Sequence, residues 1–209
     1  MKLISPDTSG LDGAASTIKY GELVAFPTDT FFALGSDGLN SRSVETVFAT
    51  KGRNPGTPVP LLIGDVEMAE ALSTKFPVEL RKLTDKYWPG ALTVVLPASS
   101  KVPSVVTGGT GTIGLRVPDH DLAREFIRLC GTPLTGTSCN ITGRDPIKEA
   151  SMVEQVFGDQ IAMCINAVCG SATEPSTVIS CDRGEISVLR LGAISVDSIR
   201  NCVGDIVVS

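Results

Sequence analysis

The sequence predicts one α/β (α+β) domain built on a mixed sheet, and three observations lead to that fold class. The 209 residues suffice for one well-packed domain, and no internal repeat, low-complexity tract or long charged linker divides them. Helical and strand patterns alternate along the chain. Several predicted strands follow one another without a helix between them, which disfavours a purely parallel sheet. We therefore expect a single domain over residues 1–209.

The individual elements follow from apolar spacing and from start and stop signals. Helices are predicted over residues 11–20, 43–50, 65–72, 78–88, 121–129, 152–157 and 196–200. Asp119 is expected to cap the helix at 121–129, and Gly131 to end it. Strands are predicted at residues 22–26, 60–63, 92–96, 113–117, 161–165, 177–180 and 186–191. Pro27 ends the first strand, because proline cannot donate to a ladder.

Composition and charge exclude several function classes. The net charge of −5 argues against charge-driven nucleic-acid binding by the whole surface, although it allows a local basic cleft. The N-terminal residues lack a signal-peptide pattern, and no apolar stretch is long enough to span a bilayer. The six cysteines show no C-x-x-C spacing. We expect reduced, mostly buried thiols in a cytoplasmic protein with no zinc site and no membrane partner.

Two short stretches predict a polar site for a small anionic ligand. The apolar run that ends at Phe26 leads into Thr28, Asp29 and Thr30. Two cations, Lys51 and Arg53, flank a glycine at the end of a predicted helix. Cations at a helix C-terminus also complement the macrodipole without any ligand, and this alternative suits Lys51 better than Arg53.

Two further arginines interrupt apolar strands. Arg116 and Arg190 each lie on the polar face that strand alternation predicts, so solvent is one possible environment for both. Each also lies near a glycine, Gly114 or Gly192, where a ligand could approach the backbone closely. Guanidinium groups match carboxylate and phosphate geometry, which makes both residues candidate ligand contacts.

Small hydroxyl residues gather around Gly136. A segment such as 135–140 can present hydroxyls and backbone N–H groups to an anion, although an isolated polar turn is the more common interpretation. Ser138 and Asn140 are two residues apart, so an extended segment would place them on one side and Cys139 in the core. His120 is expected to be a solvated first-turn residue, and a single histidine argues against a histidine-dependent metal site.

A glycine pattern at residues 109–114 fits G-x-G-x-x-G but has the wrong context for a dinucleotide site. The residues after it read as a strand and not as a helix, so we expect a mobile glycine turn. The sequence contains no P-loop motif.

Taken together and in this order, these segments resemble the YrdC-like threonylcarbamoyl-AMP synthase family in its single-domain form. The matching segments are Phe26-Pro-Thr-Asp-Thr30 with Leu34-Gly35, Lys51-Gly-Arg53, Trp88-Pro-Gly90-Ala-Leu-Thr93, Ile113-Gly-Leu-Arg116-Val-Pro118, Thr137-Ser138-Cys-Asn140, Pro175-Ser-Thr177-Val and Leu189-Arg190-Leu-Gly192. They extend over residues 22–192. Cys139 replaces an alanine that is frequent in the family, and Phe31-Phe32-Ala33 departs modestly from its pattern.

The resemblance implies a twisted open fold around a large, concave, basic cleft. It implies a nucleotidyltransferase that converts L-threonine, bicarbonate and ATP to threonylcarbamoyl-AMP and pyrophosphate, for N6-threonylcarbamoyladenosine in tRNA. By this resemblance, Thr30, Arg116 and Ser176 contact threonine. The ATP side comprises Lys51, Arg53, Thr112, Ser138, Asn140 and Arg190, and the catalytic pair is Lys51 and Arg53.

The resemblance also implies Mg²⁺ carried with ATP and few dedicated protein ligands for it. Further expected partners are tRNA or double-stranded RNA and downstream threonylcarbamoyl transferase proteins. Segments 54–58 and 105–111 are candidate closing loops that would exclude water. We expect the chain to lack the additional C-terminal domain of long family members.

Three alternatives stay open at the level of sequence. The first is a non-catalytic RNA-binding module on the same scaffold, and the second is a relative that uses carbamoyl-phosphate. The third is a paralogue that kept the fold and lost efficient synthesis.

Overall fold

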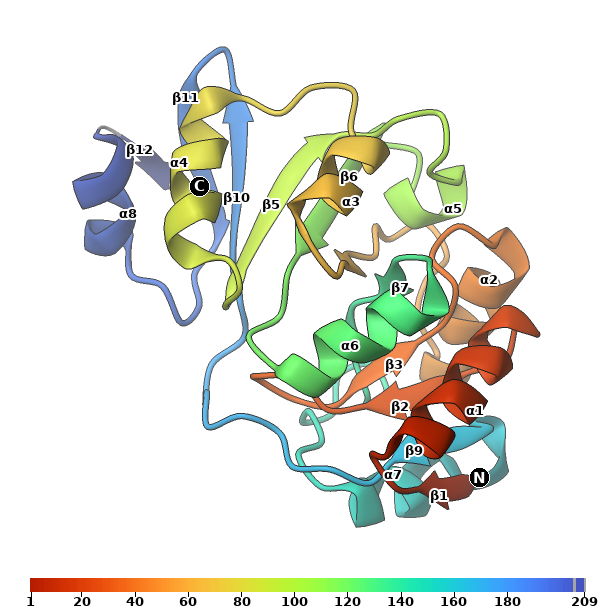
Figure 1. Ribbon diagram of the computed structural model, residues 1–209. Helices are drawn as coiled ribbons and strands as arrows, with labels where there is room; N and C mark the ends of the chain where they lie inside the picture. Colours follow the sequence, from red (N-terminus) through yellow and green to blue (C-terminus); the bar gives the residue numbers. More distant parts are fainter. Residues whose placement is uncertain (205, 209) are drawn as a thin grey trace.

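The strands form two mixed sheets in the computed structural model, which describes residues 1–204 and 206–208 (Figure 1). The five-stranded sheet has the order β1-β9-β2-β3-β8, and the seven-stranded sheet has the order β12-β11-β10-β5-β6-β4-β7. Both sheets contain parallel and antiparallel pairs: β1 runs parallel to β9, for example, and β5 runs antiparallel to β6. The mixed α/β prediction is confirmed, with the strands divided between two sheets.

The strand bounds follow the sheet orders. The five-stranded sheet contains β1 (Lys2–Ile4), β9 (Met163–Ile165), β2 (Val24–Phe26), β3 (Ala33–Gly35) and β8 (Thr137–Ser138). The seven-stranded sheet contains β12 (Ile206–Val208), β11 (Glu185–Arg190), β10 (Thr177–Asp182), β5 (Leu92–Pro97), β6 (Thr112–Arg116), β4 (Leu61–Leu62) and β7 (Leu134–Thr135).

Helices cover both faces of the five-stranded sheet. Its helices are α1 (Thr8–Lys19), α6 (Asp121–Cys130), α2 (Ser41–Lys51) and α7 (Ala150–Phe157), followed by a 3-10 turn (Gly158–Gln160). Alternation along β2 explains this double burial. Val24 and Phe26 pack with apolar residues of α1 and α6, whereas Ala25 packs with residues of α2 and α7. A strand buried on both faces reads as a continuous apolar run, as residues 23–26 do.

The remaining helices pack with the seven-stranded sheet. They are α3 (Val66–Leu72), α4 (Val78–Tyr87), α5 (Ser104–Thr107) and α8 (Val196–Val203). Figure 1 shows α4 and α8 side by side, and the Tyr87 hydroxyl donates to the Ser198 carbonyl at 2.9 Å. This sheet carries the largest apolar cluster, which includes Leu80, Leu83 and Leu92.

A short segment joins the two sheets. The chain leaves the seven-stranded sheet at Thr135 and enters the five-stranded sheet at Thr137. The fully buried Thr135 hydroxyl donates to the Leu34 carbonyl at 2.7 Å and accepts from the Ser36 N–H at 3.0 Å. Gly136 lies between β7 and β8, and a Cβ there would lie 3.0 Å from Leu62 Cγ and 3.1 Å from the Pro60 carbonyl oxygen, so a side chain would have to displace its neighbours. This joint fixes the two sheets relative to each other.

Several sequence predictions need correction at element boundaries. The cap of α6 is His120 and not Asp119: the His120 Nδ1 accepts from the Ala123 N–H at 3.4 Å. The His120 Nε2 lies 2.9 Å from the Val168 carbonyl, so the residue is not merely solvated. The sequence also failed to indicate strands β1, β3 and β12, each of only three residues.

The position of the glycine turn agrees with expectation, whereas only half of the cysteines are buried. Gly108, Gly109 and Gly111 have positive φ, and strand β6 follows them, which confirms that this is no dinucleotide motif. Three cysteines (130, 139 and 164) are buried and the other three are partly exposed, and all six are free. Burial raises the pKa of Cys130 and Cys164 to about 12. Among the described residues, no helix is long and apolar enough to cross a membrane.

We expect the contact between α6 and β2 to contribute strongly to stability. The rings of Phe26 and Phe126 are both fully buried and meet edge to face at 5.3 Å. Replacing Phe126→Ala should lower the free energy of unfolding by about 3–5 kcal/mol, because it removes apolar burial and leaves a cavity. The control Leu129→Ala, at an exposed position of the same helix, should change it by about 0.5 kcal/mol or less. Equal denaturant midpoints for the two variants would contradict this assignment.

Candidate functional site

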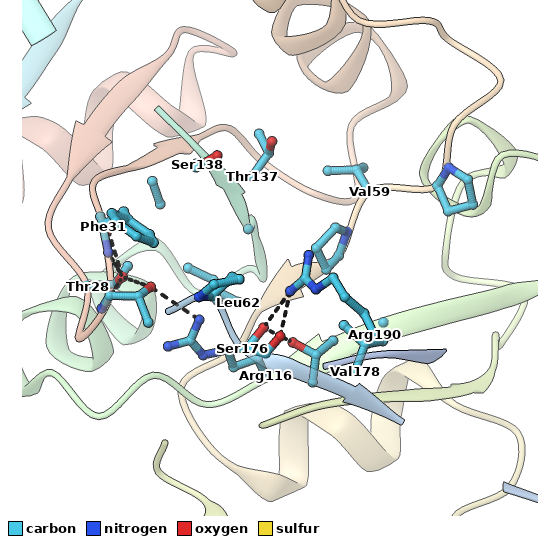
Figure 2. Close-up of a pocket in the computed structure, with 18 of the residues that line it drawn as sticks. Thr28, Phe31, Val59, Leu62, Arg116, Thr137, Ser138, Ser176, Val178 and Arg190 are labelled. Carbon is cyan, nitrogen blue, oxygen red and sulfur yellow. Dashed lines mark hydrogen bonds between the residues drawn. The ribbon is translucent and has the colours of Figure 1, made fainter. Parts of the chain in front are cut away.

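A cavity of about 490 Å³ lies between elements of the two sheets (Figure 2). One wall comes from the turn between β2 and β3 and from β8 of the five-stranded sheet. The opposite wall comes from β5, β6, β10 and β11 of the seven-stranded sheet. The cavity therefore depends on the joint at residues 134–137, which sets the spacing of these walls.

The charged residues that line the cavity are all arginines in the described part of the chain, namely Arg53, Arg116 and Arg190. Eight hydroxyl residues line it as well: Thr28, Thr30, Thr93, Thr110, Thr112, Thr137, Ser138 and Ser176. No carboxylate is among the described lining residues. Cations in a partly apolar hollow that no carboxylate lines attract anions more strongly than the same charges in water. The predicted local basic cleft is present in an acidic protein.

Arg116 is a buried residue at the end of β6. Its Nη2 donates to Asp29 Oδ1 at 2.5 Å, and the two side chains are only 8% and 12% exposed. Its Nε donates to the Gly90 carbonyl at 3.0 Å, and its Nη1 lies 3.5 Å from the Thr30 hydroxyl. The solvent alternative for Arg116 is therefore wrong. The guanidinium is held in one orientation and contributes to the cavity wall.

Arg190 enters the cavity from β11. Its Nη2 donates to the Ser176 carbonyl at 2.6 Å and lies 3.2 Å from the Ser176 hydroxyl. That hydroxyl also lies 2.8 Å from Thr93 on β5, so a short network connects three strands (Figure 2). Arg190 has no carboxylate partner among the described residues. Burial among the walls, and then the nearby Arg116, lower the pKa of its guanidinium.

Arg53 lies just beyond the end of α2, at Gly52. Its Nη2 donates to the Pro58 carbonyl at 2.7 Å, and its Nη1 lies 3.4 Å from the Thr137 hydroxyl. Its Nε is buried and has no hydrogen-bond partner among the described residues. Burial lowers the pKa of this guanidinium too. An unpaired buried donor beside a polar cavity is a group that a bound anion could satisfy.

Lys51 lies behind the cavity wall and does not line it. The side chain is buried, and Nζ donates to the Ser138 carbonyl, to the Asn140 carbonyl at 2.5 Å and to Asn140 Oδ1 at 3.2 Å. All three ammonium protons are therefore directed at the segment that follows Thr137. Burial lowers the pKa of Lys51 to about 8; Cys139 offsets part of this shift and Arg53 adds to it. The geometry gives Lys51 a role in supporting this segment.

The segment after Thr137 has the orientation that residue spacing predicted. The Ser138 hydroxyl donates to Asn140 Oδ1 at 2.6 Å, so both side chains lie on one side, and Cys139 is fully buried in the apolar cluster. Only Ser138 reaches the cavity. The Asn140 amide instead donates to the Ile141 carbonyl at 3.1 Å and to the Arg144 carbonyl at 2.5 Å. Direct contact of Lys51 and Asn140 with a nucleotide stays a prediction.

The other predicted residues converge on the cavity. Thr30, Thr112 and Ser176 all line it, together with Ser138 and the three arginines. Sequence analysis placed Thr28, Asp29, Thr93, Thr110 and Thr137 within motifs or segments but assigned none of them to threonine or ATP. The first two belong to a motif that the sequence did indicate. Thr93 becomes relevant only because β5 and β10 are neighbours in the sheet.

The two predicted closing loops pack against each other at one side of the cavity. The Val59 N–H donates to the Val106 carbonyl at 2.9 Å, which joins the end of one loop to the other. Pro58 and Thr110 line the cavity from these segments. A Cβ on Gly108 would lie 2.7 Å from the Gly56 carbonyl, so this glycine allows the close approach. Closure itself stays a prediction.

Comparison with known proteins identifies the family of this chain. A family model named Sua5/YciO/YrdC, with the description "Telomere recombination", matches residues 16–192. The chain belongs to the Sua5/YciO/YrdC family. Proteins named threonylcarbamoyl-AMP synthase from Pyrococcus abyssi and Bacillus subtilis are 36% and 34% identical to it, each over 92% of the chain. One of that name from Marinobacter nauticus is 32% identical over 87%.

The family relatives differ in length. This chain spans 57% of the Pyrococcus protein and 56% of the Bacillus protein, slightly more than half of each. Its match covers 96% of the Marinobacter protein.

Solved structures of the Sua5/YciO/YrdC family share this fold. The structure of Pyrococcus abyssi Sua5 complexed with L-threonine has a TM-score of 0.96 and 33% sequence identity; the match covers all of this chain and 63% of that one. Escherichia coli YciO has a TM-score of 0.82 at 23% identity, and the match covers 95% of this chain and 98% of that one. The YciO likeness shows the fold alone.

The lowered pKa of Lys51 predicts a pH dependence of stability. Between about pH 8 and pH 10.5 the unfolded chain keeps a proton on Lys51 that the folded protein has lost, so the penalty for burying the charge is relieved as pH rises. The unfolding free energy of the parent, relative to Lys51→Met, should therefore increase across this window, with a slope of up to about 1.4 kcal/mol per pH unit. Denaturant unfolding of both proteins at several pH values measures this difference. A flat difference would show that folding leaves the pKa of Lys51 unshifted, and a decreasing difference would show that folding raises it.

Proposed function

We propose that this member of the Sua5/YciO/YrdC family is an L-threonylcarbamoyladenylate synthase. As a nucleotidyltransferase it would combine L-threonine, bicarbonate and ATP into threonylcarbamoyl-AMP and release pyrophosphate. The observation that carries the proposal is the cavity with three arginines and no lining carboxylate among the described residues. The family relatives named threonylcarbamoyl-AMP synthase, and the threonine complex of a structure with the same fold, support it.

Threonine would bind at the side of the cavity that Arg116 occupies. A guanidinium in a fixed orientation suits a carboxylate, because planar donors and planar acceptors can pair twice. The Thr30 hydroxyl lies 3.5 Å from Arg116 Nη1, and the Ser176 hydroxyl lies between Thr93 and Arg190; both have hydrogen-bond capacity for the amine or hydroxyl of the amino acid. These three residues are the threonine contacts that we propose.

ATP would occupy the side with Arg53 and Arg190. Neither guanidinium has a carboxylate partner among the described residues, so both can compensate phosphate charge. Thr112 and Ser138 add hydroxyl donors. Transfer of the adenylyl group requires the carbamate oxygen in line with the α-phosphate, and requires stabilised charge on the departing pyrophosphate. Positioned cations supply both without a covalent nucleophile.

Lys51 and Asn140 would act by holding Ser138 in place. Their hydrogen bonds converge on residues 138–144, directly behind the wall that carries Ser138. Of the two residues Lys51 and Arg53, we therefore propose that Arg53 contacts phosphate and that Lys51 supports the segment that carries Ser138.

Magnesium would enter with ATP. The described residues contain no group of three or more His, Cys, Asp or Glu side chains arranged to hold a metal. Hydroxyl oxygens of the wall could complete the shell of an ion that keeps several waters and binds mainly phosphate, which fits a Mg²⁺–ATP substrate. The ion would share the charge of the leaving pyrophosphate.

The intermediate expected from threonine and bicarbonate is a carbamate that water destroys. We propose that segments 54–58 and 105–111 close over the cavity and exclude water during the reaction. The product would be used by threonylcarbamoyl transferase proteins that modify tRNA. A tRNA-modification role also favours a cytoplasmic location, and it leaves tRNA or double-stranded RNA as a possible additional ligand to be tested.

The decisive experiment tests whether the reaction requires all three substrates. Pyrophosphate release from Mg²⁺–ATP should depend on both threonine and bicarbonate, and removal of either should reduce it to background. Labelled threonine should appear in a labile adenylate. ATP cleavage that is equal with and without threonine would contradict the proposal. RNA binding without any turnover would favour the binding-module alternative.

A second prediction separates the catalytic from the structural role of Arg53. Arg53→Ala should lower kcat/KM by at least about tenfold, since a hydrogen bond to a charged group is worth about 1.5–3 kcal/mol. The control Arg42→Ala removes an exposed arginine from α2, the helix that Arg53 follows, and should leave kcat/KM unchanged. Melting temperatures of the same samples must be similar for the comparison to count. A loss in melting temperature without a loss in turnover would show that Arg53 only ends the helix.

A further inference from the structure

Asp29 is an acidic residue that contacts an arginine of an otherwise carboxylate-free cavity. It does not line the cavity itself. Its Oδ1 lies 2.5 Å from Arg116 Nη2, and both side chains are largely buried. Asp29 thus contacts the proposed threonine ligand only through Arg116.

Among the described residues, three groups contact the Arg116 guanidinium, and Asp29 is the only charged one of these three. The other two are the Gly90 carbonyl on Nε and the more distant Thr30 hydroxyl on Nη1. Charge-assisted hydrogen bonds are about twice as strong as neutral ones. Without the Asp29 carboxylate, the Gly90 carbonyl would still hold Nε, but Nη2 would lose its charged partner. The guanidinium would then be less firmly oriented.

Asp29 is itself held from behind by the segment that crosses from β9 to β10, residues 166–176 (Figure 1). The Gly170 N–H donates to the Thr28 carbonyl at 2.9 Å, and a Cβ on Gly170 would lie 2.5 Å from the Asp29 carbonyl oxygen. Lys148 Nζ donates to the Ala172 carbonyl at 2.7 Å, and His120 Nε2 lies 2.9 Å from the Val168 carbonyl. The crossing segment is therefore anchored on both sides of Gly170.

We propose that Asp29 is a positioning residue that orients Arg116 toward the carboxylate of the amino-acid substrate, and that Gly170 permits the close contact that holds Asp29 in place. This inference rests on the proposed function for the identity of the ligand. It assigns a role to the acidic residue of the Phe26–Thr30 motif, which the proposed mechanism does not use.

The sign of the effect distinguishes positioning from simple electrostatics. Asp29 repels the carboxylate of the incoming threonine, so removal of the Asp29 charge should tighten threonine binding if the repulsion between these two carboxylates alone matters. If Asp29 acts by orienting Arg116, its removal should weaken binding, because a mobile guanidinium loses its paired geometry. The two accounts predict opposite changes in affinity.

The first test is calorimetric titration of threonine into the parent and into Asp29→Asn, which keeps the shape of the side chain. We expect Kd for threonine to rise at least tenfold, with Kd for Mg²⁺–ATP changed less than twofold. The matched control is Asp121→Asn, which breaks an exposed ion pair with Arg124 and should change neither affinity. An unchanged or lower Kd for threonine in Asp29→Asn overturns the proposal.

A second variant approaches Asp29 without altering any charge. Gly170→Ala should displace the backbone of Asp29 and weaken threonine binding in the same direction. Gly13→Ala adds the same methyl group where no atom lies within 4 Å, and should leave threonine binding unchanged. Equal threonine affinity for these two variants would overturn the part assigned to Gly170.

A measurement on the parent protein keeps the proposal testable if a variant fails to fold or threonine fails to bind. The NMR signals of the Arg116 side chain, identified by their loss in Arg116→Lys, should show a guanidinium with restricted rotation. Free rotation in the parent overturns the positioning role. Absence of threonine binding to the parent would instead refute the proposed function, and a comparison of these NMR signals between the parent and Asp29→Asn would still decide whether Asp29 holds Arg116.

Discussion

The joint between the two sheets is the constraint on which the cavity depends. Thr135 accepts from Ser36 and donates to Leu34, while Gly136 allows the chain to pass between the sheets. Arg116 and Arg190 belong to the seven-stranded sheet, whereas Thr30 and Ser138 belong to segments of the five-stranded sheet. A shift of one sheet against the other would therefore separate groups that must contact one ligand.

The cations around this joint fall into two groups, those that face the cavity without an acidic partner in the described part of the chain and those that are held by neighbouring oxygens. Arg53 and Arg190 face the cavity with no acidic partner among the described residues. Lys51 is buried behind the wall and satisfied by oxygens of the 138–140 segment, and Arg116 is held by Asp29. Cations of the first group attract the ligand, whereas the hydrogen bonds of Lys51 and the ion pair of Arg116 fix these side chains in one orientation.

Sequence reasoning correctly predicted features that depend on nearby residues, and it failed for features that depend on contacts between distant segments. Apolar spacing located most helices, and residue alternation correctly placed Cys139 in the core with Ser138 and Asn140 on the opposite side. Residue alternation could not decide whether Arg116 faces solvent or a ligand site, because it predicts the face of the strand on which a side chain lies but not what packs on that face. Strands β1, β3 and β12 were missed because three residues carry too little periodicity.

The sequence by itself determined the mixed α/β class, the family likeness, and the three arginines and four of the eight hydroxyl residues that line the cavity. These depend on local patterns and on motifs whose order along the chain can be read directly. Only the tertiary structure decided that Lys51 and Asn140 stand behind the wall, that Thr93 joins Ser176, and that Asp29 faces Arg116. Such pairings join residues up to 89 positions apart, and they arise from the packing of two sheets, which no single segment encodes.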